Sequence, residues 1–197
     1  PPLKTFLAKR QVFFMLERYL VEHCSPTLAA IKTANLFTFT YQSDEELEDY
    51  IHDWNQKFQQ KGVSIAILRN RASKALLYVY RKSRLDADLQ KPGVPEFLSR
   101  YGYKEFHADY GIAQLKKKFA EEESFPHEIG LFLGYPLEDV TGFIENAGKN
   151  SKCSGCWKVY CNECETLKLF AQFKKCKDVY LGLFLQGKRN VLQLTVA

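Results

Sequence analysis

Apolar side chains recur every three or four residues along much of the chain, which is the spacing of amphipathic helices. The pattern is clearest over residues 44–61, where Ser43 and Glu46 have capping-box spacing and Gly62 ends the periodicity. The first helix is expected to end just before Pro26, because a proline disfavours helical geometry in the residue before it. The same periodicity predicts helices over residues 5–23, 83–91, 95–101, 109–123, 126–133, 136–146 and 162–185.

Shorter segments have the β-branched and aromatic character of strands. Residues 36–40 alternate between the two faces of a strand, and the apolar runs 63–69 and 74–81 predict an antiparallel hairpin at the centre of a sheet. Residues 157–160 and 191–196 are expected to form further strands. The irregular order of helices and strands predicts a single α+β domain over residues 1–197, with a mixed or antiparallel sheet flanked by helices.

The composition is that of an ordinary globular protein, with 46% hydrophobic and 26% charged residues, which excludes disordered and low-complexity classes. No apolar run approaches the ~20 residues of a membrane span, and no signal-peptide pattern is visible at the start. Six cysteines are too few for a disulfide scaffold at this length. We therefore expect a cytoplasmic protein with no membrane contact.

The charge is polarised along the chain, although the net value of +5 is modest. Residues 43–53 carry acids and no Lys or Arg, whereas Lys and Arg dominate residues 149–189. Residues 129–144 have the pattern of a helix-turn-helix, but the second helix is acidic and would repel phosphate. The sequence therefore argues against nucleic-acid binding, and the polarised faces leave a protein-interaction domain without chemistry as an alternative.

Four cysteines near the C-terminus, Cys153, Cys156, Cys161 and Cys164, have the paired spacing of a zinc or iron–sulfur site. The intervening residues 157–160 have strand character, which would hold the two pairs about 16 Å apart. Thiolates that share one zinc are only about 4 Å apart. No cofactor is therefore predicted, and a metal-binding or redox module at this cluster remains an alternative.

Four segments resemble an uncharacterised bacterial family known as domain of unknown function thirty-seven ninety-three. They are residues 23–37, 77–81, 125–140 and 157–160, which appear in the family's order and span nearly the whole chain. The resemblance implies no assigned reaction, cofactor or partner. The family usually has glycine at the position of Ala30, and its pattern includes a lysine at the position of Lys158.

The reactive residues within these segments suggest a site for an anionic small molecule. In this hypothesis Lys32 and Arg81 clamp the anion, with Tyr160 as a further ligand-binding residue. The catalytic variant is a thiol-dependent enzyme in which Cys24 is the nucleophile, His127 its base, and Glu128 orients the imidazole. The identity of the small molecule, the oligomeric state and whether the protein is an enzyme are left open by the sequence.

Overall fold

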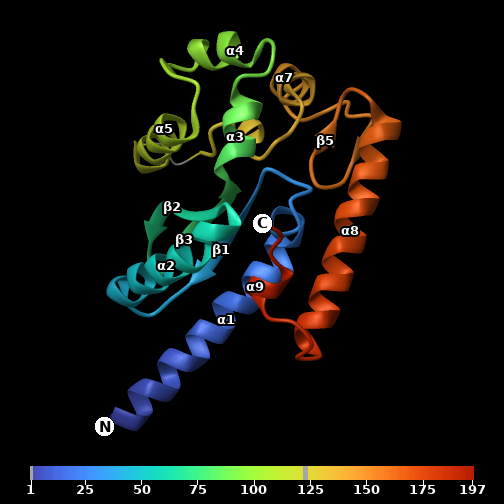
Figure 1. The fold of residues 1–197 in the computed structure, drawn as a ribbon. Helices are drawn as coiled ribbons and strands as arrows, with labels where there is room; N and C mark the ends of the chain where they lie inside the picture. Colours follow the sequence, from blue (N-terminus) through green and yellow to red (C-terminus); the bar gives the residue numbers. More distant parts are fainter. Residues whose placement is uncertain (1, 122–123) are drawn as a thin grey trace.

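In the computed structural model, which describes residues 2–121 and 124–197, a three-stranded antiparallel sheet lies between two layers of helices (Figure 1). Its strands are β1 (Ala34–Thr40), β2 (Val63–Arg71) and β3 (Lys74–Arg81), in the order β1-β3-β2. The predicted hairpin is confirmed, but only β3 is central, because β1 pairs with β3 and leaves β2 at an edge. The α+β prediction is therefore confirmed, with an antiparallel rather than a mixed sheet.

The helices account for most of the chain, and a second sheet is formed by β4 (Cys153–Ser154) and β5 (Lys158–Val159). Among the described residues, no helix has both the length and the apolar character needed to cross a bilayer. The helices are α1 (Pro2–Leu28), α2 (Asp44–Phe58), the 3-10 helix η1 (Gln59–Lys61), α3 (Lys82–Leu89), α4 (Val94–Arg100), α5 (Ala108–Glu121), α6 (Ile129–Phe132), α7 (Leu137–Glu145), α8 (Glu163–Leu185) and α9 (Val191–Leu194).

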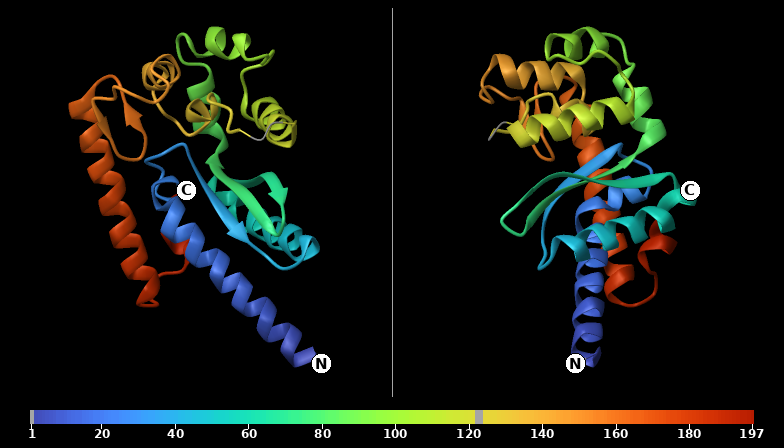
Figure 2. Two further views of the ribbon diagram at one scale, coloured as in Figure 1. Left: turned by 180° about the vertical axis from the view of Figure 1, so that it is seen from behind. Right: turned by 90° about the vertical axis from the view of Figure 1, so that its left-hand side faces the viewer.

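The alternating side chains of the central strand divide the interior into two hydrophobic cores. Leu77 and Val79 of β3 face a core shared with α1, α2, α8 and α9. Leu76 and Tyr78 face a core shared with α3 to α7. The Tyr78 hydroxyl donates to the Phe132 carbonyl at 2.5 Å, which ties α6 to the sheet. The views in Figure 2 show α8 alongside the C-terminal half of α1, whose N-terminal half extends beyond the other elements.

Helix α1 is longer than predicted, because it continues through Pro26 to Leu28. Proline removes one backbone N–H from the helix, but it lies in the last turn, where few hydrogen bonds are lost. The Ser25 hydroxyl donates to the Val21 carbonyl within the same turn. Ser25 is thus buried inside α1.

The C-terminal segment was predicted as a strand, and this prediction is wrong. Residues 191–194 form α9, whose start is fixed by a capping box between Asn190 and Gln193. The strand predicted over residues 157–160 is confirmed only at Lys158 and Val159. The last two residues of the helix predicted over 109–123 lie outside the described residues.

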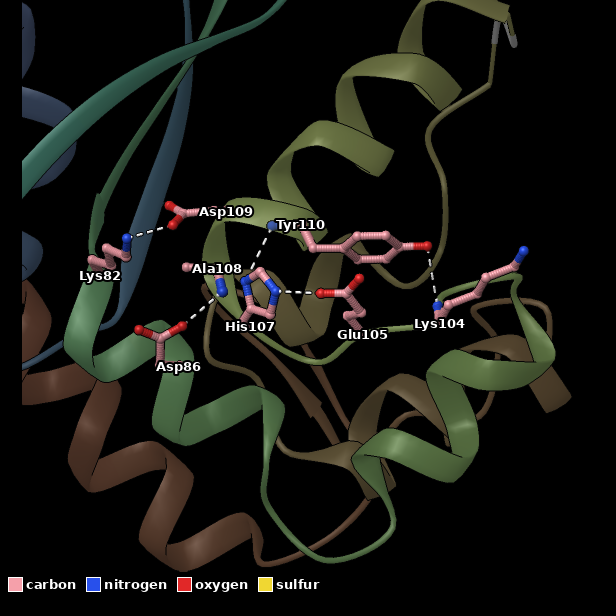
Figure 3. Close-up of polar contacts among 8 residues, drawn as sticks. All are labelled: Lys82, Asp86, Lys104, Glu105, His107, Ala108, Asp109 and Tyr110. Carbon is pink, nitrogen blue, oxygen red and sulfur yellow. Dashed lines mark hydrogen bonds and ion pairs between the residues drawn. The ribbon is translucent and has the colours of Figure 1, made fainter.

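The start of α5 is anchored to α3 by polar contacts (Figure 3). The Asp86 carboxylate accepts a hydrogen bond from the Ala108 backbone N–H at 2.7 Å, which satisfies a free donor of the first turn. Lys82 forms an ion pair with Asp109 at 2.5 Å. These contacts fix α5 against the chain that leaves β3, on the side of the sheet that carries α6 and α7.

Candidate functional site

Lys32 lies in the loop that joins α1 to β1, with its amine buried beneath α8 and the β4–β5 hairpin. The residue is 7% exposed. The loop turns at Ala30, which has a φ of 58° in the left-handed region, and the Pro26 carbonyl accepts from the Lys32 backbone N–H at 3.1 Å. The end of α1 therefore sets the direction in which the side chain enters the interior.

The Lys32 amine is a buried cation with no negatively charged side chain paired to it among the described residues. Its Nζ donates to the Ala34 carbonyl at 2.6 Å and lies 5.4 Å from the centre of the Tyr135 ring. No carboxylate of the described residues lies within 4 Å of it. Burial lowers the pKa of Lys32 to about 8, against a smaller opposing effect of the Cys156 and Cys24 thiols.

An aromatic wall faces this amine. The Tyr135 ring stacks on Trp157 with centroids 4.4 Å apart, and Trp157 meets Phe170 of α8 edge to face. Burial raises the pKa of Tyr135 to about 12, so its phenol is protonated at neutral pH. The Tyr135 hydroxyl lies 3.4 Å from the Cys156 carbonyl, which places the tyrosine directly against the hairpin.

The buried carboxylate of Asp139 holds the hairpin in place. One carboxylate oxygen accepts from the Trp157 indole N–H at 2.7 Å. The other accepts from the backbone N–H groups of Tyr160 and Cys161 at 2.7 and 2.9 Å. With these donors Asp139 connects α7 to β5, so its charge is satisfied and the indole of the aromatic wall has a fixed orientation.

Two cavities open onto Lys32. The first, of about 410 Å³, is also lined by Lys174, Lys177 and the single carboxylate of Glu22, and is called here the Lys177 cavity. The second, of about 310 Å³, is called the Arg84 cavity; its charged residues are Lys32, Arg84, Lys91 and Asp88. Each cavity therefore carries three cationic side chains against one carboxylate, which favours anions.

A third cavity, the His127 cleft, lies on the other side of the aromatic wall. It has a volume of about 480 Å³ and shares Tyr135 and Cys156 with the Lys177 cavity. Its lining is mostly apolar and includes Phe143, whose ring centroid lies 5.7 Å from that of His127. The aromatic wall thus separates an apolar cleft from two cationic cavities.

A family model described as "Protein of unknown function (DUF3793)" matches residues 20–195. The chain belongs to this family. The comparison with curated proteins found no match, and neither did the comparison with solved structures.

Three of the four segments that carry the DUF3793 resemblance line these cavities. Residues 23–37 contribute His23 and Lys32 to the Lys177 cavity, residues 125–140 form much of the His127 cleft, and residues 157–160 supply Trp157. Segments that are far apart in the sequence therefore meet at the aromatic wall. Of the fourth segment, residues 77–81, none lines the three cavities.

The proposed Cys24, His127 and Glu128 triad is not assembled in this DUF3793 chain. Cys24 belongs to α1 and is fully buried in the core, and burial raises the pKa of its thiol. His127 is exposed at the apolar cleft. The Glu128 carboxylate instead accepts from Lys118 and, at 3.3 Å, from the Tyr103 hydroxyl. The cysteine that shares a cavity with His127 is Cys156.

Arg81 was expected to clamp an anion, but its side chain contacts backbone carbonyls and lines none of the three cavities. The residue is 5% exposed, and its guanidinium donates to backbone carbonyls at the end of α1 and in two other segments. These acceptors are the carbonyls of Thr27 at 2.7 Å, Lys61 at 3.1 Å, Leu28 at 2.8 Å and Val196 at 2.7 Å. Arg81 therefore joins the C-terminus to α1 and has a structural role.

Tyr160 lies on the α7 side of the hairpin, and none of the three cavities includes it. Its hydroxyl donates to the Lys149 carbonyl at 2.9 Å. Lys158, by contrast, lines the His127 cleft, while its amine donates to the Gly148 carbonyl. The contacts of Tyr160 thus give it a role in joining the hairpin to the loop after α7.

The four cysteines of the cluster have different neighbours. Cys156 faces Lys32 and Tyr135, whereas the Cys161 thiol interacts with Asp139 and the Cys153 thiol with Glu163. Within the described ranges, no group of three or more His, Cys, Asp or Glu side chains has the arrangement of a metal site. Burial is the largest cause of the raised pKa of Cys153, Cys156 and Cys161.

Sequence reasoning missed the aromatic wall and the cations that flank Lys32. Tyr135 and Trp157 were within segments that carry the resemblance, but nothing in their spacing indicates that they stack. Lys177 and Arg84 reach the cavities only because α8 and α3 pack beside the α1–β1 loop. These contacts are between distant parts of the chain, so no local pattern predicts them.

Proposed function

We propose that this DUF3793 protein binds a small anionic molecule at Lys32. The observation that carries the proposal is a buried ammonium group that lines two cavities and has no carboxylate of the described residues within 4 Å. A buried charge without a partner is costly. An anion in either cavity would provide the missing partner and would form charge-assisted hydrogen bonds with Nζ.

The aromatic wall and the flanking cations support this function. Lys177 and Arg84 lie in the two cavities without an ion pair among the described residues, and both remain available for a second negative group. Tyr135 and Phe173 provide apolar surface for the body of the molecule. The free thiols of the chain fit a reducing compartment such as the cytoplasm, which is part of the proposal.

The test is ligand-dependent thermal stabilisation with inorganic phosphate and with oxalate as probes. We expect at least one anion to raise the melting temperature of the wild type, by about 5–10 °C at a hundredfold excess over Kd. Lys32→Gln should lose this response. The matched control is Lys175→Gln, which removes an exposed lysine of α8 that lines none of the three cavities.

The control separates a site at Lys32 from general screening of positive charge. If the anions stabilise Lys32→Gln as much as the wild type, their effect arises elsewhere on the surface and the proposal is wrong. It is equally wrong if neither anion changes the melting temperature of any of the three proteins.

A further inference from the structure

Burial of the Lys32 amine increases the share of its neutral, nucleophilic form. Nζ has one hydrogen bond, to the Ala34 carbonyl, and no carboxylate of the described residues lies within 4 Å to hold the amine in its charged form. Lysine amines react with carbonyl compounds only when they are unprotonated, and burial among apolar groups is a common way to achieve this. The lowered pKa of Lys32, about 8, agrees with this geometry.

A molecule can reach this amine, because Lys32 lines both the Lys177 cavity and the Arg84 cavity. A small aldehyde in either cavity would lie against the Lys32 side chain. A negative group on the same molecule would be attracted by Lys177 on one side or by Arg84 on the other. Each of the two cavities therefore places a second cation in the same lining as Lys32.

We propose that Lys32 forms an imine with a small carbonyl compound that also carries a carboxylate or phosphate. This inference rests on the proposed function and specifies the class of anion. The Nζ lone pair attacks the carbonyl carbon, and a C–N bond forms as the carbonyl π bond breaks. The oxygen leaves as water with the two Nζ hydrogens, so that C=N replaces C=O and no oxidant or reductant is consumed.

The experiment is reductive trapping with glyoxylate, which is both an aldehyde and a carboxylate. The protein is incubated with glyoxylate and sodium cyanoborohydride near neutral pH, and the modified lysines are located by peptide mass spectrometry. At pH 7 about one tenth of an amine with a pKa of about 8 is neutral, against less than about one thousandth at pKa 10.4. We therefore expect Lys32 to be modified at least about tenfold faster than the exposed Lys175.

Matched variants and probes separate this inference from the proposed function. Lys32→Gln should remove the fast adduct, Lys175→Gln should retain it, and oxalate should slow it by competition. If Lys32 reacts no faster than Lys175 while oxalate still stabilises the protein through Lys32, the imine is refuted and the anion site stands. If propionaldehyde, which has no charge, labels Lys32 as fast as glyoxylate, the anionic part of the inference is refuted.

Discussion

Replacement of Lys32 by methionine should stabilise the protein near neutral pH, although it removes a polar contact. The pKa of Lys32 is lowered from 10.5 to about 8. At about 1.4 kcal/mol per pKa unit, this shift corresponds to a free-energy penalty of about 3 kcal/mol for holding the charged amine in the folded state. Loss of the hydrogen bond to the Ala34 carbonyl costs about 1 kcal/mol. Methionine has a similar length and no charge, so the expected net gain in unfolding free energy is about 2 kcal/mol.

The gain should depend on pH in a defined direction. The folded pKa of Lys32, about 8, lies below the ordinary value of 10.5, so between these values the unfolded state binds one more proton than the folded state. The stability of the wild type then rises with pH by about 1.4 kcal/mol per pH unit from this group. The penalty is fully present below about pH 8 and disappears as pH approaches 10.5, so the advantage of Lys32→Met should shrink.

The measurement is urea unfolding followed by circular dichroism, near pH 7 and near pH 10, for the wild type, Lys32→Met and the control Lys175→Met. Groups that titrate in this range and do not interact with Lys32 contribute equally to the wild type and the variants, so the comparison reports on Lys32 and on the Cys24 and Cys156 thiols beside it. A difference between Lys32→Met and wild type that stays the same at both pH values would refute the reasoning. So would a loss of stability near pH 7.

Three further outcomes are expected. Arg81→Met should lower the unfolding free energy by at least about 3 kcal/mol, because several buried carbonyls lose a charged donor. Arg189→Met, in the exposed segment between α8 and α9, should change it little, and equal urea midpoints for the two variants would contradict this. Ala30→Gly should raise the melting temperature, since the left-handed φ of 58° costs a non-glycine residue about 1 kcal/mol; a decrease would show that this turn is not strained. Cys24, which is fully buried, should be alkylated by iodoacetamide only after unfolding, and mass spectrometry that finds it labelled as fast as the exposed Cys164 would show that the core opens.

Local patterns predicted the elements whose signals are contained within one segment. Helix α2 follows directly from its amphipathic spacing and from Ser43, whose side chain accepts from the Glu46 backbone N–H as expected of a cap. The hairpin follows from two apolar runs and a short turn, in which Ala72 and Ser73 both have positive φ. The conformation of these two elements is determined by residues close together in the sequence, so the tertiary structure has little influence on it.

Predictions failed where a distant contact decides between local alternatives. The rule for residues before proline would end α1 at Ser25, but the last turn is retained because Leu28 packs in the core and its carbonyl binds Arg81. Residues 191–196 form a mostly apolar run that is too short for its periodicity to distinguish a strand from a helix. Asn190 and Gln193 have the spacing of a capping box, which was the available signal for α9.

The contrast between Lys32 and Arg81 explains why residue type alone could not identify the site. Both are buried cations within segments that carry the family resemblance, and both were expected to clamp an anion. The planar guanidinium of Arg81 presents several donors in fixed directions, and the carbonyls left free at the end of α1 match them. The Lys32 amine has one hydrogen-bond acceptor, the Ala34 carbonyl, and the residue lines two cavities. A cation whose N–H donors are all bound by backbone carbonyls stabilises the fold. A cation that has few hydrogen-bond acceptors and lies beside a cavity can instead bind the negative group of a ligand.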